Sequence, residues 1–103
     1  MAKKLAFIIT EDKHLRHIAG LIKSAARKGH DISIFIMDKG VFFTENDEFI
    51  SIIKEHNINV TVCEYSCNAN GVKSRADVFH YASQFENAKM INGLEKSDRL
   101  VKF

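Results

Sequence analysis

The first 63 residues alternate between short apolar runs and segments with helical spacing, and this alternation restricts the fold more than any other feature. Residues 5–9, 32–37 and 60–63 are apolar or β-branched runs, as expected of strands buried on both faces. Residues 13–28 and 44–56 carry apolar side chains three and four positions apart, which is typical of amphipathic helices. Strands that alternate with helices predict a parallel sheet with right-handed crossovers. We therefore expect an α/β fold with three α/β/α layers and a mainly parallel sheet of four to five strands.

The pattern is weaker in the last third of the chain. Residues 73–82 begin with the spacing of a capping box, but their apolar side chains fit no helical face, so we assign them no element. Residues 83–86 form a clearer capping box and predict a helix that buries side chains as far as Leu94. Residues 98–103 predict a short final strand. We expect a single domain over residues 1–103.

Both cysteines of the chain lie where its character changes. After the strand run 60–63 the sequence becomes small and polar and ends in Asn70-Gly71, which is the composition of a turn or a short helix. Cys63 is the last residue of the strand, and Cys67 falls in the turn, near the start of any helix that follows. Unpaired backbone N–H groups at such a place stabilise a thiolate and lower the pKa of the thiol. The stretch therefore predicts a site for sulfur chemistry.

The topology predicts which other residues surround the cysteines. In a parallel sheet, ligands bind outside the carboxyl ends of the strands. Residues 10–12, 38–43 and 63–71 follow the three predicted strands and meet at that edge, with both cysteines among them. The further candidates for a ligand contact or a lid are Glu11, Gly40, Phe42, Phe43, Asn70 and Gly71.

Some of these residues also have a plainer interpretation. Phe42 and Phe43 occupy a predicted loop, where they would form an apolar lid over the cysteine or a contact between subunits. Both interpretations fit the sequence equally. Glu11 and Asp12 fit the start of a helix, and Thr10 or Asp12 is the expected N-cap residue.

Charge and cysteine content narrow the choice of partners and compartment. A formal net charge of +2 is too small to indicate a nucleic-acid or membrane partner. The apolar run after Lys4 stops at Thr10, which is too short for a secretory signal, and no stretch approaches the length of a membrane span. Two cysteines do not make a disulfide framework. We therefore expect a cytoplasmic protein.

The residues at the carboxyl edge argue against several other functions of α/β proteins. The turn that begins at Thr10 is acidic and has no glycine, whereas a flavin or nucleotide phosphate loop needs glycine. A phospho-receiver needs an aspartate where Cys63 stands. A thioredoxin-type site has two residues between its cysteines and a cis-proline, but three residues separate Cys63 from Cys67 and the chain has no proline. Metal binding by Cys63, Cys67 and His80 lacks a fourth ligand at a recognised spacing. We predict neither cofactor nor metal.

Several segments, taken together and in order, resemble one known family. They are Ala-Arg-Lys-Gly-His-Asp-Ile at 26–32, Met-Asp-Lys-Gly-Val at 37–41, Val-Cys at 62–63 with Gly-Val at 71–72, and the closing run 97–103. This pattern is similar to the DsrE/DsrF/TusD-like sulfur-relay proteins. The resemblance implies a small α/β subunit of a homo- or hetero-oligomer, often a trimer or hexamer, whose reactive cysteine lies near a subunit interface. By position, Cys63 matches the sulfur-carrying cysteine of the family, whereas Cys67 has no counterpart.

The resemblance implies a persulfide carrier, and two other hypotheses stay open beside it. The Cys63 thiolate would attack a donor persulfide or an oxidised sulfur compound and pass the sulfur to an acceptor, so donor and acceptor proteins are the expected partners. A carrier and a sulfurtransferase that turns over share this pattern. The second hypothesis is a non-catalytic oligomeric binding subunit with incidental cysteines. The third is a thiol redox sensor, which requires Cys67 to be close enough to resolve an oxidised Cys63.

Overall fold

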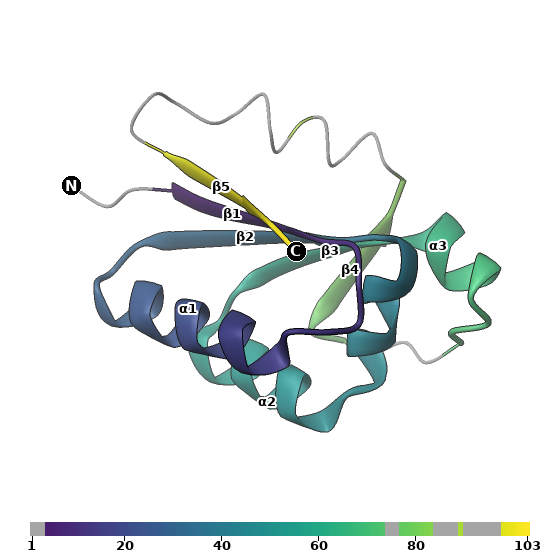
Figure 1. The fold of residues 1–103 in the computed structure, drawn as a ribbon, viewed down its shortest axis with the longest axis horizontal. Helices are drawn as coiled ribbons and strands as arrows, with labels where there is room; N and C mark the ends of the chain where they lie inside the picture. The colour runs from purple at the N-terminus through teal and green to yellow at the C-terminus, as the bar shows by residue number, and fades with distance from the viewer. Residues whose placement is uncertain (1–3, 74–76, 84–88, 90–97) are drawn as a thin grey trace.

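A computed structural model of the chain describes residues 4–73, 77–83, 89 and 98–103. The strands are β1 (Lys4–Ile9), β2 (Asp31–Ile36), β3 (Asn59–Cys63), β4 (Phe79–Ala82) and β5 (Arg99–Lys102). The helical segments are α1 (Leu15–Arg27), the 3₁₀ segment η1 (Asp38–Glu45), α2 (Asp47–His56) and α3 (Glu64–Ala69). The strands form one sheet in the order β4-β3-β2-β1-β5, and every neighbouring pair is parallel (Figure 1). The predicted α/β class and parallel sheet are confirmed.

Helices α1 and α2 lie side by side on one face of the sheet (Figure 1). The main hydrophobic core lies between them and the sheet. Its fully buried members include Phe7 and Ile9 of β1, Ile22 of α1, Ile34 of β2 and Val62 of β3. No helix in the described part of the chain is long and apolar enough to cross a membrane.

The opposite face of the sheet is also buried at its centre. Because side chains alternate along a strand, Ala6, Ile8, Phe35 and Cys63 point away from α1 and α2. All four are buried, yet none belongs to the main core cluster. The continuous apolar runs of the sequence therefore correspond to strands that are covered on both faces, as predicted.

The region after α3 differs from the sequence expectation. Residues 79–82 form the edge strand β4, although we assigned no element to 73–82. Phe79 and Tyr81 are two residues apart and both contact the core, so their spacing was that of a strand. The predicted final strand is confirmed as β5. The helix predicted from residue 83 falls almost entirely outside the described residues.

Two helix starts also differ from the expectation, for identifiable reasons. The prediction that Thr10 or Asp12 caps α1 is wrong: the N-cap residue is His14, and it makes no side-chain capping bond. Thr10 instead donates both its N–H and its hydroxyl to the carbonyl of Phe103, each at 2.8 Å, and so ties β1 to the end of β5. We predicted a loop followed by a helix that begins at residue 44. In the structure the 3₁₀ segment η1 extends to Glu45, so helix α2 begins only at Asp47. Its cap is Asn46, whose Oδ1 accepts the N–H of Phe49 at 2.9 Å.

Gly40 fixes the position of η1 against the end of β1. A Cβ atom at residue 40 would lie 2.5 Å from the carbonyl oxygen of Ile9, which is closer than real side chains come. The same oxygen accepts the N–H of Met37 at 2.9 Å. Only glycine lets the chain turn this tightly over the strand end, so Gly40 is a packing requirement of the fold.

We predict opposite effects for two glycine-to-alanine changes. Gly40→Ala should lower the free energy of unfolding by about 1–3 kcal/mol, because backbone must move to accept the methyl group. Gly20→Ala should raise it by about 0.5–1 kcal/mol, because the site lies inside α1 with nothing within 4 Å of the new atom. Urea unfolding followed by circular dichroism measures both. Equal stability of the two variants would contradict this account of η1.

Candidate functional site

The cysteines lie at the carboxyl edge of the sheet, as the topology predicted. Cys63 is the last residue of β3 and also the N-cap residue of α3. Cys67 follows one turn later, inside α3. Helix α3 stands at the end of the sheet where β2 and β3 finish (Figure 1). Neither cysteine is in a disulfide.

Both thiols are fully covered, but on different sides of the sheet. Cys63 and Cys67 have 0% exposure. Alternation along β3 places Cys63 with Thr61, facing away from α1 and α2, whereas Cys67 belongs to the main core cluster. The Cys63 side chain makes no capping hydrogen bond, so the expected contact of this thiol with the N–H groups of α3 is absent.

The end of α3 explains why Cys67 faces the core. Gly71 has a φ of +70°, and it lets the N–H of Val72 reach the carbonyl of Cys67 at 2.9 Å. The N–H of Gly71 bonds to the carbonyl of Asn68 at 3.3 Å, which completes a Schellman cap. Val72 is buried in the same cluster as Cys67. Gly71, a predicted site residue, therefore ends the helix and anchors it.

A set of hydrogen bonds joins α3 to η1, and we call the three residues Asp38, Ser66 and Asn70 the latch. The N–H of Asp38 donates to Ser66 Oγ at 2.9 Å. Asn70 Nδ2 donates to the carbonyl of Ser66 at 2.8 Å and to that of Asp38 at 3.3 Å. Asp38 itself has a φ of +51°, a left-handed conformation that is uncommon for a residue with a side chain. The latch therefore holds a strained residue at the edge that also carries the cysteines.

The structure separates the two aromatic residues predicted as a lid. Phe43 is 3% exposed, and its ring stacks on Phe49 with centroids 5.3 Å apart. Phe49 in turn stacks on Phe79 of β4 at 6.0 Å. Phe42 is 37% exposed. Phe43 is thus a core residue, and Phe42 is the member of the pair that can meet a ligand or another subunit.

The first strand end does not join this group. Glu11 is exposed in the turn after β1, two strands away from the end of β3. The strand order reverses between β1 and β5, where doubly wound folds usually bind ligands. That position is filled by Phe103, whose ring packs edge-on against Phe7 at 5.9 Å and His17 at 5.6 Å. The carboxyl ends of β2 and β3, which η1 and α3 follow, are therefore the part of the edge that holds the cysteines.

Sequence reasoning missed three residues near the cysteines. Asp38 and Ser66 were not singled out, since only their pairing across η1 and α3 makes them unusual. Ser66 and Thr44 are the buried polar residues among those described. Ser66 Oγ accepts the N–H of Asp38, and the Thr44 hydroxyl donates to the carbonyl of Val41 within η1. Tyr65, which directly follows the exposed Glu64, is 75% exposed on α3. An aromatic residue midway between the two cysteines, in a polar stretch, was the available signal.

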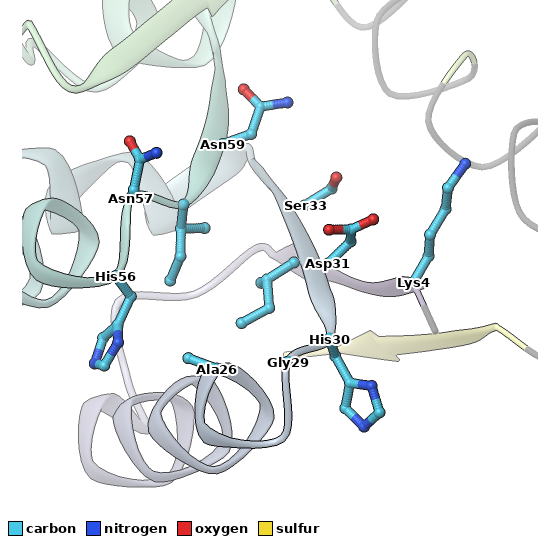
Figure 2. A pocket seen from close by; sticks show the side chains of 11 residues that line it. Lys4, Ala26, Gly29, His30, Asp31, Ser33, His56, Asn57 and Asn59 are labelled. Atoms are coloured by element: carbon cyan, nitrogen blue, oxygen red, sulfur yellow. The ribbon is translucent and has the colours of Figure 1, made fainter. Parts of the chain in front are cut away.

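A hollow of about 450 Å³ lies at the other edge of the sheet, away from the cysteines. Figure 2 shows it among the starts of the strands and the ends of α1 and α2. The side chains of His30, His56 and Asn57 diverge around it, so these polar groups do not converge on one point (Figure 2). The hollow is not part of the cysteine site.

Comparison with known proteins agrees with this architecture. The family described as DsrE/DsrF-like matches residues 3–103. The crystal structure of the YchN protein from E. coli superposes with a TM-score of 0.72 at 14% identity, covering 100% of both chains. A conserved protein of unknown function from Bacteroides thetaiotaomicron gives 0.76 at 16% identity, covering 98% of this chain and 95% of that one. No curated protein matches the chain. At these identities the two solved structures establish the fold alone. The family model matches almost the whole length of the chain, and the chain therefore belongs to the DsrE/DsrF-like family.

Proposed function

We propose that this protein carries sulfane sulfur as a persulfide on Cys63 and works in a sulfur relay. The observation that carries the proposal is the place of Cys63: it ends β3 at the carboxyl edge of a DsrE/DsrF-like sheet. Catalytic and binding groups of parallel α/β sheets concentrate at that edge. Cys67 faces the core and has a secondary role.

The transfer step needs only a donor persulfide and the Cys63 thiolate. The thiolate attacks the outer sulfur of the donor, and a new S–S bond forms to Cys63 Sγ while the S–S bond of the donor breaks. The donor leaves as a thiolate, so electrons balance and no further oxidant is required. Transfer to an acceptor thiol repeats the same exchange. The reaction suits a reducing cytoplasm, where we place the protein.

The burial of Cys63 defines what the site must do before it reacts. A side chain with 0% exposure protects a bound persulfide from water, but it must become accessible to a donor. Phe42, exposed on η1 at the same edge, supplies an apolar cover in this proposal. Among the described residues, Phe42, Tyr65 and Leu100 are the large exposed hydrophobic side chains. We infer that such surfaces join copies of this chain in a homo-oligomer, a trimer or a hexamer, or receive the donor and acceptor proteins.

A second candidate function is a binding subunit without sulfur chemistry. The full burial of both thiols favours it, because an inert buried cysteine behaves as a small hydrophobic residue. In that case Phe42 and Tyr65 recruit the partner, and the cysteines only fill space. The two functions differ in whether Cys63 accepts sulfur.

Sulfur uptake separates these candidates. We expect wild type and Cys67→Ala to gain one sulfur atom after incubation with a persulfide donor, and Cys63→Ala to gain none, because the attacking thiolate is missing. Intact-protein mass spectrometry measures the adduct. Urea unfolding of each variant serves as the control for folding. An adduct that persists in Cys63→Ala contradicts the proposal, and absence of an adduct in all three proteins favours the binding subunit.

The two neighbouring phenylalanines give a test of the cover. Phe42→Ala should shorten the lifetime of the persulfide on Cys63 while changing the free energy of unfolding by less than about 1 kcal/mol, since the ring is partly exposed. Phe43→Ala should cost about 3–5 kcal/mol, because the ring is stacked in the core. Phe42→Leu is the matched control that keeps an apolar side chain. A persulfide that survives equally long in Phe42→Ala and wild type would remove Phe42 from the site.

A further inference from the structure

The two cysteines are close in sequence but separated in the structure, and the proposed function assigns no step to Cys67. Cys67 is only four residues from Cys63, yet one thiol faces the main core and the other faces away from it. Cys63 is the extended N-cap residue of α3, whereas Cys67 lies inside the helix, so the two side chains do not share a helical face. Cys67 can therefore react with Cys63 only if α3 changes its conformation.

The latch determines whether α3 can change. Ser66 Oγ is the acceptor for the N–H of Asp38, and Asn70 Nδ2 holds the carbonyl of the same residue. Asp38 thus has both backbone groups bonded to α3 while its φ is +51°. Loss of these bonds leaves a strained residue without the partners that keep it in place.

The packing indicates which side of the latch moves. Gly40 is wedged against the carbonyl of Ile9, and Phe43 is stacked in the core, so η1 is fixed. Helix α3 has six residues, which is too short to be stable without its contacts. It is held by the latch, by Cys67 and by Val72. Helix α3 is therefore the side of the latch that is free to move.

We propose that the latch keeps Cys67 from attacking a persulfide on Cys63, and that its opening permits this attack. The inference rests on the proposed function of Cys63. The Cys67 thiolate attacks Cys63 Sγ, the new S–S bond joins the two cysteines, and the terminal sulfur leaves with its proton as hydrosulfide. The sulfane sulfur is reduced and the two thiols are oxidised, so no other oxidant is needed. The closed latch preserves sulfur for an acceptor, and the open latch discharges it as sulfide.

The test uses protein loaded with sulfur from a persulfide donor and then freed of the donor. Ser66→Ala should release sulfide and form the Cys63–Cys67 disulfide about tenfold faster than wild type, because the N–H of Asp38 loses its acceptor. Asn70→Ala should act in the same direction, and it replaces Ser66→Ala if that variant does not fold. Asn68→Ala, an exposed position on the same helix, is the matched control and should release sulfide at the wild-type rate. Cys67→Ala should release none by this route.

A second measurement reports the latch without sulfur chemistry. Alkylation of Cys67 in the unloaded protein should be about tenfold faster in Ser66→Ala than in wild type. It should be unchanged in Ile22→Val, which weakens the core at α1 and leaves the latch intact. Equal rates in wild type and Ser66→Ala, or equal acceleration in Ile22→Val, overturn the latch. If Cys63 takes up no sulfur, both the proposed function and the attack by Cys67 are wrong. The alkylation rates then still test whether the latch controls the exposure of Cys67.

Discussion

The close contact of Gly40 with the carbonyl of Ile9 is the constraint on which the carboxyl edge depends. It presses η1 against the end of β1, and the parallel register places the ends of β2 and β3 beside it. With η1 fixed there, the N–H and carbonyl of Asp38 face α3 and find partners in Ser66 and Asn70. The backbone contact at the end of β1 thereby positions α3, the helix that follows Cys63 at the end of β3.

Burial and reactivity make opposite demands on this site. A persulfide lasts longer where water and stray thiols are excluded, whereas transfer requires that the sulfur be reached. The chain meets the first demand with a thiol at the end of a strand that is covered on both faces. In the proposed function the second demand falls on α3, a helix of six residues that follows that thiol and is tied to η1 by the latch. The proposed role of Cys63 as a sulfur carrier depends on reconciling these two demands.

The sequence predicted the sheet well because strands buried on both faces leave continuous apolar runs, and amphipathic helices leave a clear period. It also placed Cys63 at the carboxyl edge of the sheet from topology alone. It failed where tertiary contacts override local pattern. Thr10 bonds to the end of β5 instead of capping α1, and β4 was missed because four residues give too little periodicity. Phe43 and Ser66 owe their roles to partners on other elements, which no local pattern records.

The most direct test of the central claim is to locate the transferred sulfur in the wild-type protein. After loading and alkylation, a glutamate-specific protease cleaves between Glu64 and Tyr65 and puts each cysteine in its own peptide. Mass spectrometry then shows which peptide carries the additional sulfur. The account predicts sulfur on the Cys63 peptide, with the Cys67 peptide unchanged at short times. Sulfur confined to the Cys67 peptide, or found on neither, would contradict it.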